Sequence, residues 1–173
     1  MNISFLFLTI TTGLVLIYVL FKPLDIKQQE FVDVPLFELI SFSVYDLSNK
    51  GLNNIMLGKK ATKYSDRYTV ENIDYTDNSK NFVANMKSNY GVYKDDIVDL
   101  EGNVTYTRED GLIFKTQFIT YNKQTGIAST DRSYISYKGQ DKVMGTSLLY
   151  NNVLNQVSSK NVVAIYNFKE KTK

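Results

Sequence analysis

Residues 111–138 read GLIFKTQFITYNKQTGIASTDRSYISYK, and the fold depends on the pattern in this stretch. Phe, Ile, Tyr and Thr suit a pleated, half-buried surface, and they fill both ends of the stretch. Between them, residues 122–126 are Asn-Lys-Gln-Thr-Gly, a run that accepts tight-turn geometry. The stretch therefore predicts strands over 111–121, 126–129 and 133–138.

The same pattern continues in both directions. Pro23 and Pro35 are the two prolines of the chain, so nothing after residue 35 prevents a strand from donating its ladder hydrogen bonds. Turn residues are expected at 49–51, 77–79, 101–103, 109–111 and 138–141. Further strands are predicted at 36–46, 55–64, 68–76, 81–88, 91–98, 102–107, 142–150, 152–157 and 161–168. So many short strands predict an all-β sandwich, roll or barrel.

A weak repeat runs through these strands. Tyr106 matches Tyr137 at a spacing of 31 residues, and Tyr121 matches Tyr150 at 29. Residues 61–76 resemble an earlier copy. Stacked repeats of this kind suggest an elongated, open-ended β structure, whereas the alternative is a chance likeness between tyrosine-rich hairpins.

The N-terminus has a different pattern. Residues 3–21 carry no charge, and as a helix they would be roughly 28 Å long, close to the hydrocarbon thickness of a bilayer. Their threonines can hydrogen-bond to the preceding turn. The helix should end at Lys22-Pro23.

Three interpretations of this segment compete. A cleaved signal peptide needs a basic start and small residues at its cleavage site, and neither is present. A core helix that is apolar on every face is rare in so small a domain. We therefore expect a retained anchor over 1–22, a linker over 23–34, a β domain over 35–168 and a polar tail over 169–173. Lys22 and Lys27 follow the span, which alone favours a cytoplasmic β domain.

The composition excludes several functions. The chain has no His and no Cys, which removes the usual catalytic bases, thiol nucleophiles and zinc ligands. The 20 basic and 18 acidic residues are mixed along the chain, so nucleic-acid binding has little electrostatic support. We expect neither enzyme activity nor a cofactor. An anchored enzyme that acts on envelope polysaccharide is disfavoured on the same grounds.

Two local motifs have ordinary interpretations. Two acidic groups could be proposed as a carboxylate pair or a calcium site, namely Asp95, Asp96, Asp99 and Glu101, or Glu109 and Asp110. They do not follow the EF-hand spacing and are typical of solvated turns. Asn103 lies in an Asn-x-Thr glycosylation motif, yet Gly102-Asn103 also reads as the turn that begins the next strand. We favour the turn.

Three segments together resemble a known family: Gly102-Asn103-Val104, residues 119–127 and residues 142–150. They are similar to the Gly-Asn-Val strand start, the Ile-x-Tyr-Asn-x-x-x-Gly hairpin and the Gly-x-x-Leu-x-Tyr strand of the LptA/LptC/OstA superfamily. The likeness is clearest over residues 103–168 and fainter over 58–90. With one anchor in front, the arrangement resembles the LptC family rather than the soluble LptA.

This resemblance implies a twisted, V-shaped β-jelly roll in the periplasm, carried by a single span in the inner membrane. It implies that lipopolysaccharide moves along an apolar groove. It also implies an LptB/LptF/LptG-like ABC transporter at the N-terminal edge and an LptA-like bridge protein at the C-terminal edge. The periplasmic location it implies overrides the weak charge signal of Lys22 and Lys27.

Apolar residues on alternating strands are the groove candidates, since the core and the groove are expected to share one face. Ordinary core packing is the alternative role for each of them. The runner-up interpretation of the whole chain is a pilin-like or secretion-system subunit, which is disfavoured because residues 3–21 contain no acid and the helix should end at Lys22-Pro23. The groove candidates are Phe82, Ile97, Phe114, Phe118, Ile135, Leu148 and Val163.

Overall fold

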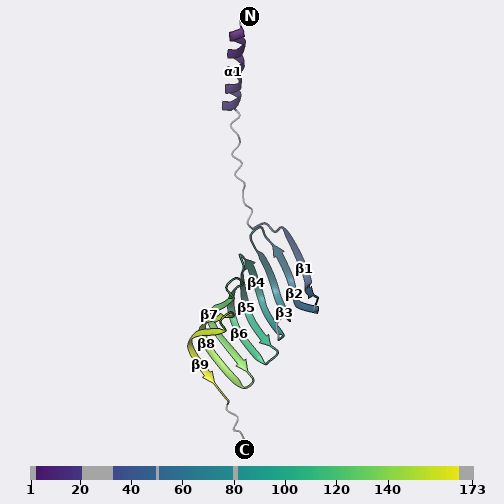
Figure 1. Ribbon diagram of the computed structural model, residues 1–173, viewed down its shortest axis with the longest axis vertical. Coiled ribbons are helices and arrows are strands. Elements are labelled where there is room, and N and C mark those ends of the chain that lie inside the picture. The colour runs from purple at the N-terminus through teal and green to yellow at the C-terminus, as the bar shows by residue number, and fades with distance from the viewer. Residues whose placement is uncertain (1–2, 21–32, 50, 80–81, 168–173) are drawn as a thin grey trace, which may run out of the picture. The chain divides into compact units, whose positions relative to one another are not determined.

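The computed structural model describes residues 3–20, 33–49, 51–79 and 82–167 (Figure 1). The chain divides into two compact units, residues 1–31 with the helix and residues 32–173 with the strands. The predicted helix end at Lys22-Pro23, most of the 23–34 linker and the 169–173 tail lie outside the described residues. These predicted boundaries stay predictions.

Helix α1 (Ile3–Leu20) is apolar on every face, and none of its side chains is buried. It is long and apolar enough to cross a membrane. Its threonine hydroxyls donate to carbonyl oxygens one turn back, from Thr11 to Phe7 at 2.9 Å and from Thr12 to Leu8 at 2.8 Å. These bonds satisfy the hydroxyls inside the helix, so the threonines do not oppose burial in lipid.

Within the described residues, the second unit is one antiparallel sheet of nine strands, each paired with the next along the chain (Figure 1). The all-β prediction is confirmed. The order follows from short connections, which make sequential strands neighbours. The strands are β1 (Phe37–Ser48), β2 (Gly51–Lys63), β3 (Tyr68–Asp77), β4 (Ala84–Lys94), β5 (Ile97–Arg108), β6 (Leu112–Asn122), β7 (Ile127–Lys138), β8 (Asp141–Asn151) and β9 (Gln156–Ile165).

Several predicted breaks are not turns. The expected turn at 101–103 is wrong, because these residues lie inside β5. The strands predicted at 126–129 and 133–138 form the single strand β7. Conversely, Asp95-Asp96 forms the turn between β4 and β5, inside the segment predicted as the strand 91–98. The same polar residues can form a bend within one strand or a turn between two strands, and composition alone does not distinguish these structures.

The bends have a common backbone cause. Ser41, Asn72, Asn103, Ser147 and Asn161 all have positive φ inside strands. Asparagine tolerates this left-handed conformation better than most residues. Where Gly102 and Asn103 occur together, the register between β5 and β6 shifts between Glu101 and Val104. Such bulges bend the strand and increase its twist, and here they recur across the sheet.

The bends curl the sheet over one of its faces. Side chains from β2 to β7, including Met56 and Ala128, pack against one buried cluster. The core lies inside the curl, where Val104 is fully buried among Ile73, Leu100 and Ile119. This curled, open sheet is a β-jelly roll.

Val104 provides a test of this core. Val104→Ala removes two buried methyl groups and should lower the free energy of unfolding by about 2 kcal/mol. Chemical denaturation of the full chain in detergent, followed by circular dichroism, measures the change. Val163→Ala is the matched control, because Val163 is 55 % exposed and should change stability little. Equal effects of the two substitutions would contradict the assigned core.

The bulge in β5 provides a second test. Gly102 has a φ of 76°, and an added Cβ would lie 2.8 Å from Asn89 Nδ2. Gly102→Ala should therefore destabilise the chain by about 1–2 kcal/mol. Asn103→Gly keeps the left-handed backbone accessible and should change the free energy of unfolding little. A neutral Gly102→Ala, measured by the same denaturation, would show that the bulge is not needed.

Candidate functional site

The sheet register defines which side chains share the concave face, called the inner face below. Leu100 pairs with Ile119, and Val104 pairs with Thr116, so the two members of each pair point to the same side, and all four side chains are buried. Residues two positions apart on one strand share a face, except where a bulge adds a residue. Tracing the pairs from strand to strand therefore assigns every strand.

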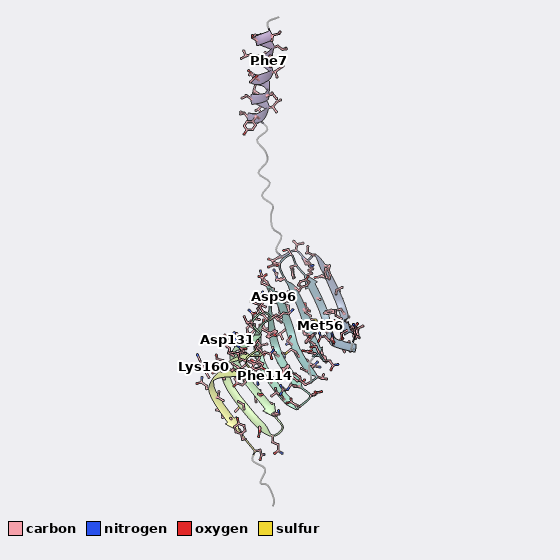
Figure 2. The ribbon with its side chains drawn as sticks, viewed as in Figure 1. Phe7, Met56, Asp96, Phe114, Asp131 and Lys160 are labelled. Carbon is pink, nitrogen blue, oxygen red and sulfur yellow. The ribbon has the colours of Figure 1, made fainter. Side chains whose placement is uncertain are left out.

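The inner face is predominantly apolar and aromatic from β1 to β9. Figure 2 labels two of its members, Met56 and Phe114, which pack against the buried cluster. Phe114 also stacks on Tyr134, with ring centroids 5.5 Å apart. The register places on this face Phe37, Leu39, Phe42, Val44, Met56, Ala61, Tyr68, Val70, Ile73, Tyr75, Met86, Tyr93, Val98, Leu100, Val104, Tyr106, Leu112, Phe114, Ile119, Tyr121, Ala128, Tyr134, Val143, Leu148, Tyr150, Val157 and Ala164.

The opposite, outer face is rich in polar contacts. Lys60 pairs with Glu38 at 2.7 Å, and Lys87 pairs with Asp74 at 2.8 Å. The side-chain hydrogen bond from Lys60 lowers the pKa of Glu38. This face is therefore suited to water, whereas the inner face is suited to apolar ligands.

Tyrosine hydroxyls add polar groups to the inner face. Tyr75 and Tyr106 are both about half-buried, and burial raises the pKa of each hydroxyl. Both hydroxyls therefore stay protonated at neutral pH and can donate hydrogen bonds. Such side chains combine an apolar ring with a polar tip, as is common where one end of a ligand is apolar and the other is wet.

The structure separates the seven predicted groove residues. Phe114 and Leu148 lie on the inner face. Phe82 lies in the β3–β4 connection, where the guanidinium of Arg108 sits 4.9 Å from its ring centroid. The other four face outward: Ile97, Phe118, Ile135 and Val163.

The prediction that all seven share the face of the core is therefore wrong. Phe118 illustrates the cause, because it pairs with Glu101, while its neighbour Ile119 pairs with Leu100 in the core. A slip of one residue moves a side chain to the opposite face. Lipid contact by the two inward residues stays a prediction.

Sequence reasoning missed the best-placed inner residues. Val98 and Leu100 alternate before the bulge, and Val104 and Tyr106 alternate after it. These four residues are spaced by even numbers of positions across Gly102, and Leu100 and Val104 are both buried. The even spacing that continues through Gly102 was the available signal.

The acidic group near β5 has a structural role. Asp96 accepts hydrogen bonds from Tyr93 at 2.9 Å and from Gln124 at 2.9 Å, and the bond from Gln124 lowers its pKa. Asp99 accepts from Thr120 at 2.6 Å. Among the described residues, no group of three Asp or Glu residues is placed to hold a metal ion.

The repeat seen in the sequence is only partly structural. Tyr121 and Tyr150 both pair with Ala128 on the inner face, so they occupy one row. Tyr106 also lies on the inner face, whereas Tyr137 pairs with Ile113 and Lys142 on the outer face. The spacing of 31 residues therefore does not relate equivalent positions.

An apolar helix long enough to cross a membrane, followed by a curled sheet with an apolar inner face, fits a membrane-anchored β-jelly-roll protein. Residues 7–167 match the family model LptC, described as lipopolysaccharide-assembly, LptC-related. The chain belongs to the LptC family and is involved in lipopolysaccharide transport. No match is found among curated proteins.

Family membership fixes the broad setting. The LptC family comprises transport proteins rather than enzymes, and its members are anchored in the inner membrane with a periplasmic domain. Lipopolysaccharide and other components of the Lpt complex are their partners. Helix α1 fits the single-pass anchor of such a protein.

Proposed function

We propose that this chain accepts lipopolysaccharide from an LptB/LptF/LptG-like ABC transporter and passes it along the inner face to an LptA-like bridge protein. The apolar inner face, which continues from β1 to β9, carries the proposal. Acyl chains gain free energy by leaving water for such a surface, at roughly 25 cal/mol per Å². No reaction is needed, because the lipid only exchanges one apolar environment for another.

The two edge strands support the proposed partners. Among the described residues, β1 and β9 each pair with one neighbour, which leaves backbone groups on their outer sides for a further strand. Both edges expose large apolar side chains, including Ile40 at 75 % and Val157 at 64 %. Strand addition at β1 by the transporter and at β9 by the bridge protein would extend the inner face across the complex.

Site-specific photocrosslinking tests the proposed path. We expect p-benzoylphenylalanine at Phe114 to crosslink to lipopolysaccharide in membranes that contain the transporter, and to do so only with ATP. Phe118 is the matched control, because it is an aromatic residue on the same strand that faces outward. Its variant should give several-fold less crosslinking.

Two outcomes would contradict this proposal. Equal yields at the two positions would show that the inner face is not the path. Crosslinks only between copies of the chain would instead favour a pilin-like subunit.

The topology needs a separate measurement. We propose that residues 33–173 lie in the periplasm, with α1 as the membrane span that anchors them. A reporter that is active only in the periplasm, fused after Lys173, should be active. Activity of a cytoplasmic reporter at the same position would refute the proposed topology, and with it the transfer.

A further inference from the structure

Two lysines at one end of the inner face lie against aromatic rings. Lys63, Tyr68 and Tyr93 occupy one row, because Lys63 pairs with Tyr68 and Tyr68 pairs with Tyr93. The two tyrosine ring centroids are 6.2 Å apart. Lys63 Nζ lies 5.2 Å from the centroid of Tyr68, and Lys123 Nζ lies 4.8 Å from that of Tyr93. We call these four residues the lysine–tyrosine cluster.

This cluster lies where the inner face ends. Lys63 is the last residue of β2, and Tyr68 is the first of β3. Lys123 follows β6 directly. Deeper along the same face, Val70 and Leu100 begin the apolar core. A ligand with its apolar part against that core would therefore have its polar end at the cluster.

These two lysines lack the direct ion pairs that the cations around them form. Among the described residues, Lys94 pairs with Asp66 at 2.7 Å, and Arg67 pairs with Asp33 at 2.7 Å, whereas neither Lys63 nor Lys123 forms an ion pair. Asp96 interacts electrostatically with Lys123, but its oxygens accept hydrogen bonds from Tyr93 and Gln124 and not from the ammonium group of Lys123. Two ammonium groups thus remain for an external anion.

The opposite end of the strands differs in this respect. There Arg108 and Lys138 both bind Asp110, at 2.7 Å and 2.8 Å. Their hydrogen bonds hold the pKa of Asp110 well below its usual range, so the carboxylate is charged at neutral pH. Both cations at this end therefore already have an anionic partner. The unpaired positive charge of the inner face is therefore concentrated at the lysine–tyrosine cluster.

We propose that the lysine–tyrosine cluster binds the phosphate monoester of the lipid headgroup whose acyl chains lie on the inner face. The inference rests on the proposed transfer function and adds a polar subsite to it. Each ammonium group supplies charge-assisted hydrogen bonds to phosphate oxygens. The ring beneath each lysine restricts its side chain beforehand, so less conformational entropy is lost on binding.

A thermodynamic cycle tests the subsite. The full chain, purified in detergent, is titrated with lipopolysaccharide and with the same lipid after enzymatic removal of its phosphates. Lys63→Gln combined with Lys123→Gln should weaken binding of the phosphorylated lipid about tenfold, and removing the phosphates should weaken wild-type binding similarly. The lysine substitutions and the removal of the lipid phosphates should both abolish the same lysine–phosphate interaction. Binding of the dephosphorylated lipid to the variant should therefore be little weaker than after either change alone.

The matched control changes net charge equally at other positions. Lys59 and Lys115 are exposed lysines that lie outside the cluster. Lys59→Gln with Lys115→Gln should leave the affinity for the phosphorylated lipid within about twofold of wild type. A loss as large as that of the cluster variant would show that net charge alone is responsible, and would overturn the proposal.

Inorganic phosphate separates the two sources of the same chemistry. At constant ionic strength, an excess of inorganic phosphate should compete only weakly, because it lacks the acyl chains that hold the lipid nearby. Competition as effective as that of the lipid itself would assign the cluster to free phosphate and overturn the headgroup assignment.

The cycle also distinguishes failure of the subsite from failure of transfer. If lipopolysaccharide binds and crosslinks at Phe114, but the affinity does not respond to the lysines or to the lipid phosphates, only the subsite is refuted. If neither lipid binds the chain, both proposals are refuted.

Discussion

Burial of one face of a sheet that has no second layer is the constraint on which this structure depends. The described part of residues 32–173 contains strands and no helix, so within this unit the apolar face must be covered by the sheet itself. Left-handed residues such as Asn72 and Asn103 make this feasible, because they bend the strands while the inner face stays continuous. Val104, next to one such bend, is the most deeply buried residue of the core.

The same solution leaves the structure open at its edges. A barrel would pair its first and last strands, but here β1 and β9 occupy opposite ends of the strand order. Apolar surface therefore reaches both edges, and the proposed path begins and ends there. The lysine–tyrosine cluster adds the polar end that an amphipathic lipid requires. Apolar and ionic contacts would then be made by separate parts of one ligand.

The sequence predicted the class of structure better than the individual contacts. Strand-forming residues and Asn/Gly turns indicated an all-β chain, and the order of three loose motifs indicated the family. The face of the sheet on which a residue lies could not be predicted past the bulges. Phe118 and Ile119 are equally apolar, and only their partners show that Phe118, opposite Glu101, faces outward and Ile119, opposite Leu100, faces inward. Gly102-Asn103 reads as a turn because a left-handed bulge and a tight turn favour the same residues. The cluster was missed because Lys63 and Lys123 are 60 positions apart and meet only through strand pairing.

The strict order of the strands also affects how the sheet opens and closes. Each described strand pairs only with its neighbours in sequence, so the stability of the sheet depends mainly on contacts between adjacent strands, as in a repeat protein. Such a sheet has low contact order, and its terminal strands can detach without breaking the centre. In amide hydrogen exchange, β1 and β9 would lose protection first and β5 last. The strands that we propose meet a partner are thus the ones that cost the least free energy to rearrange.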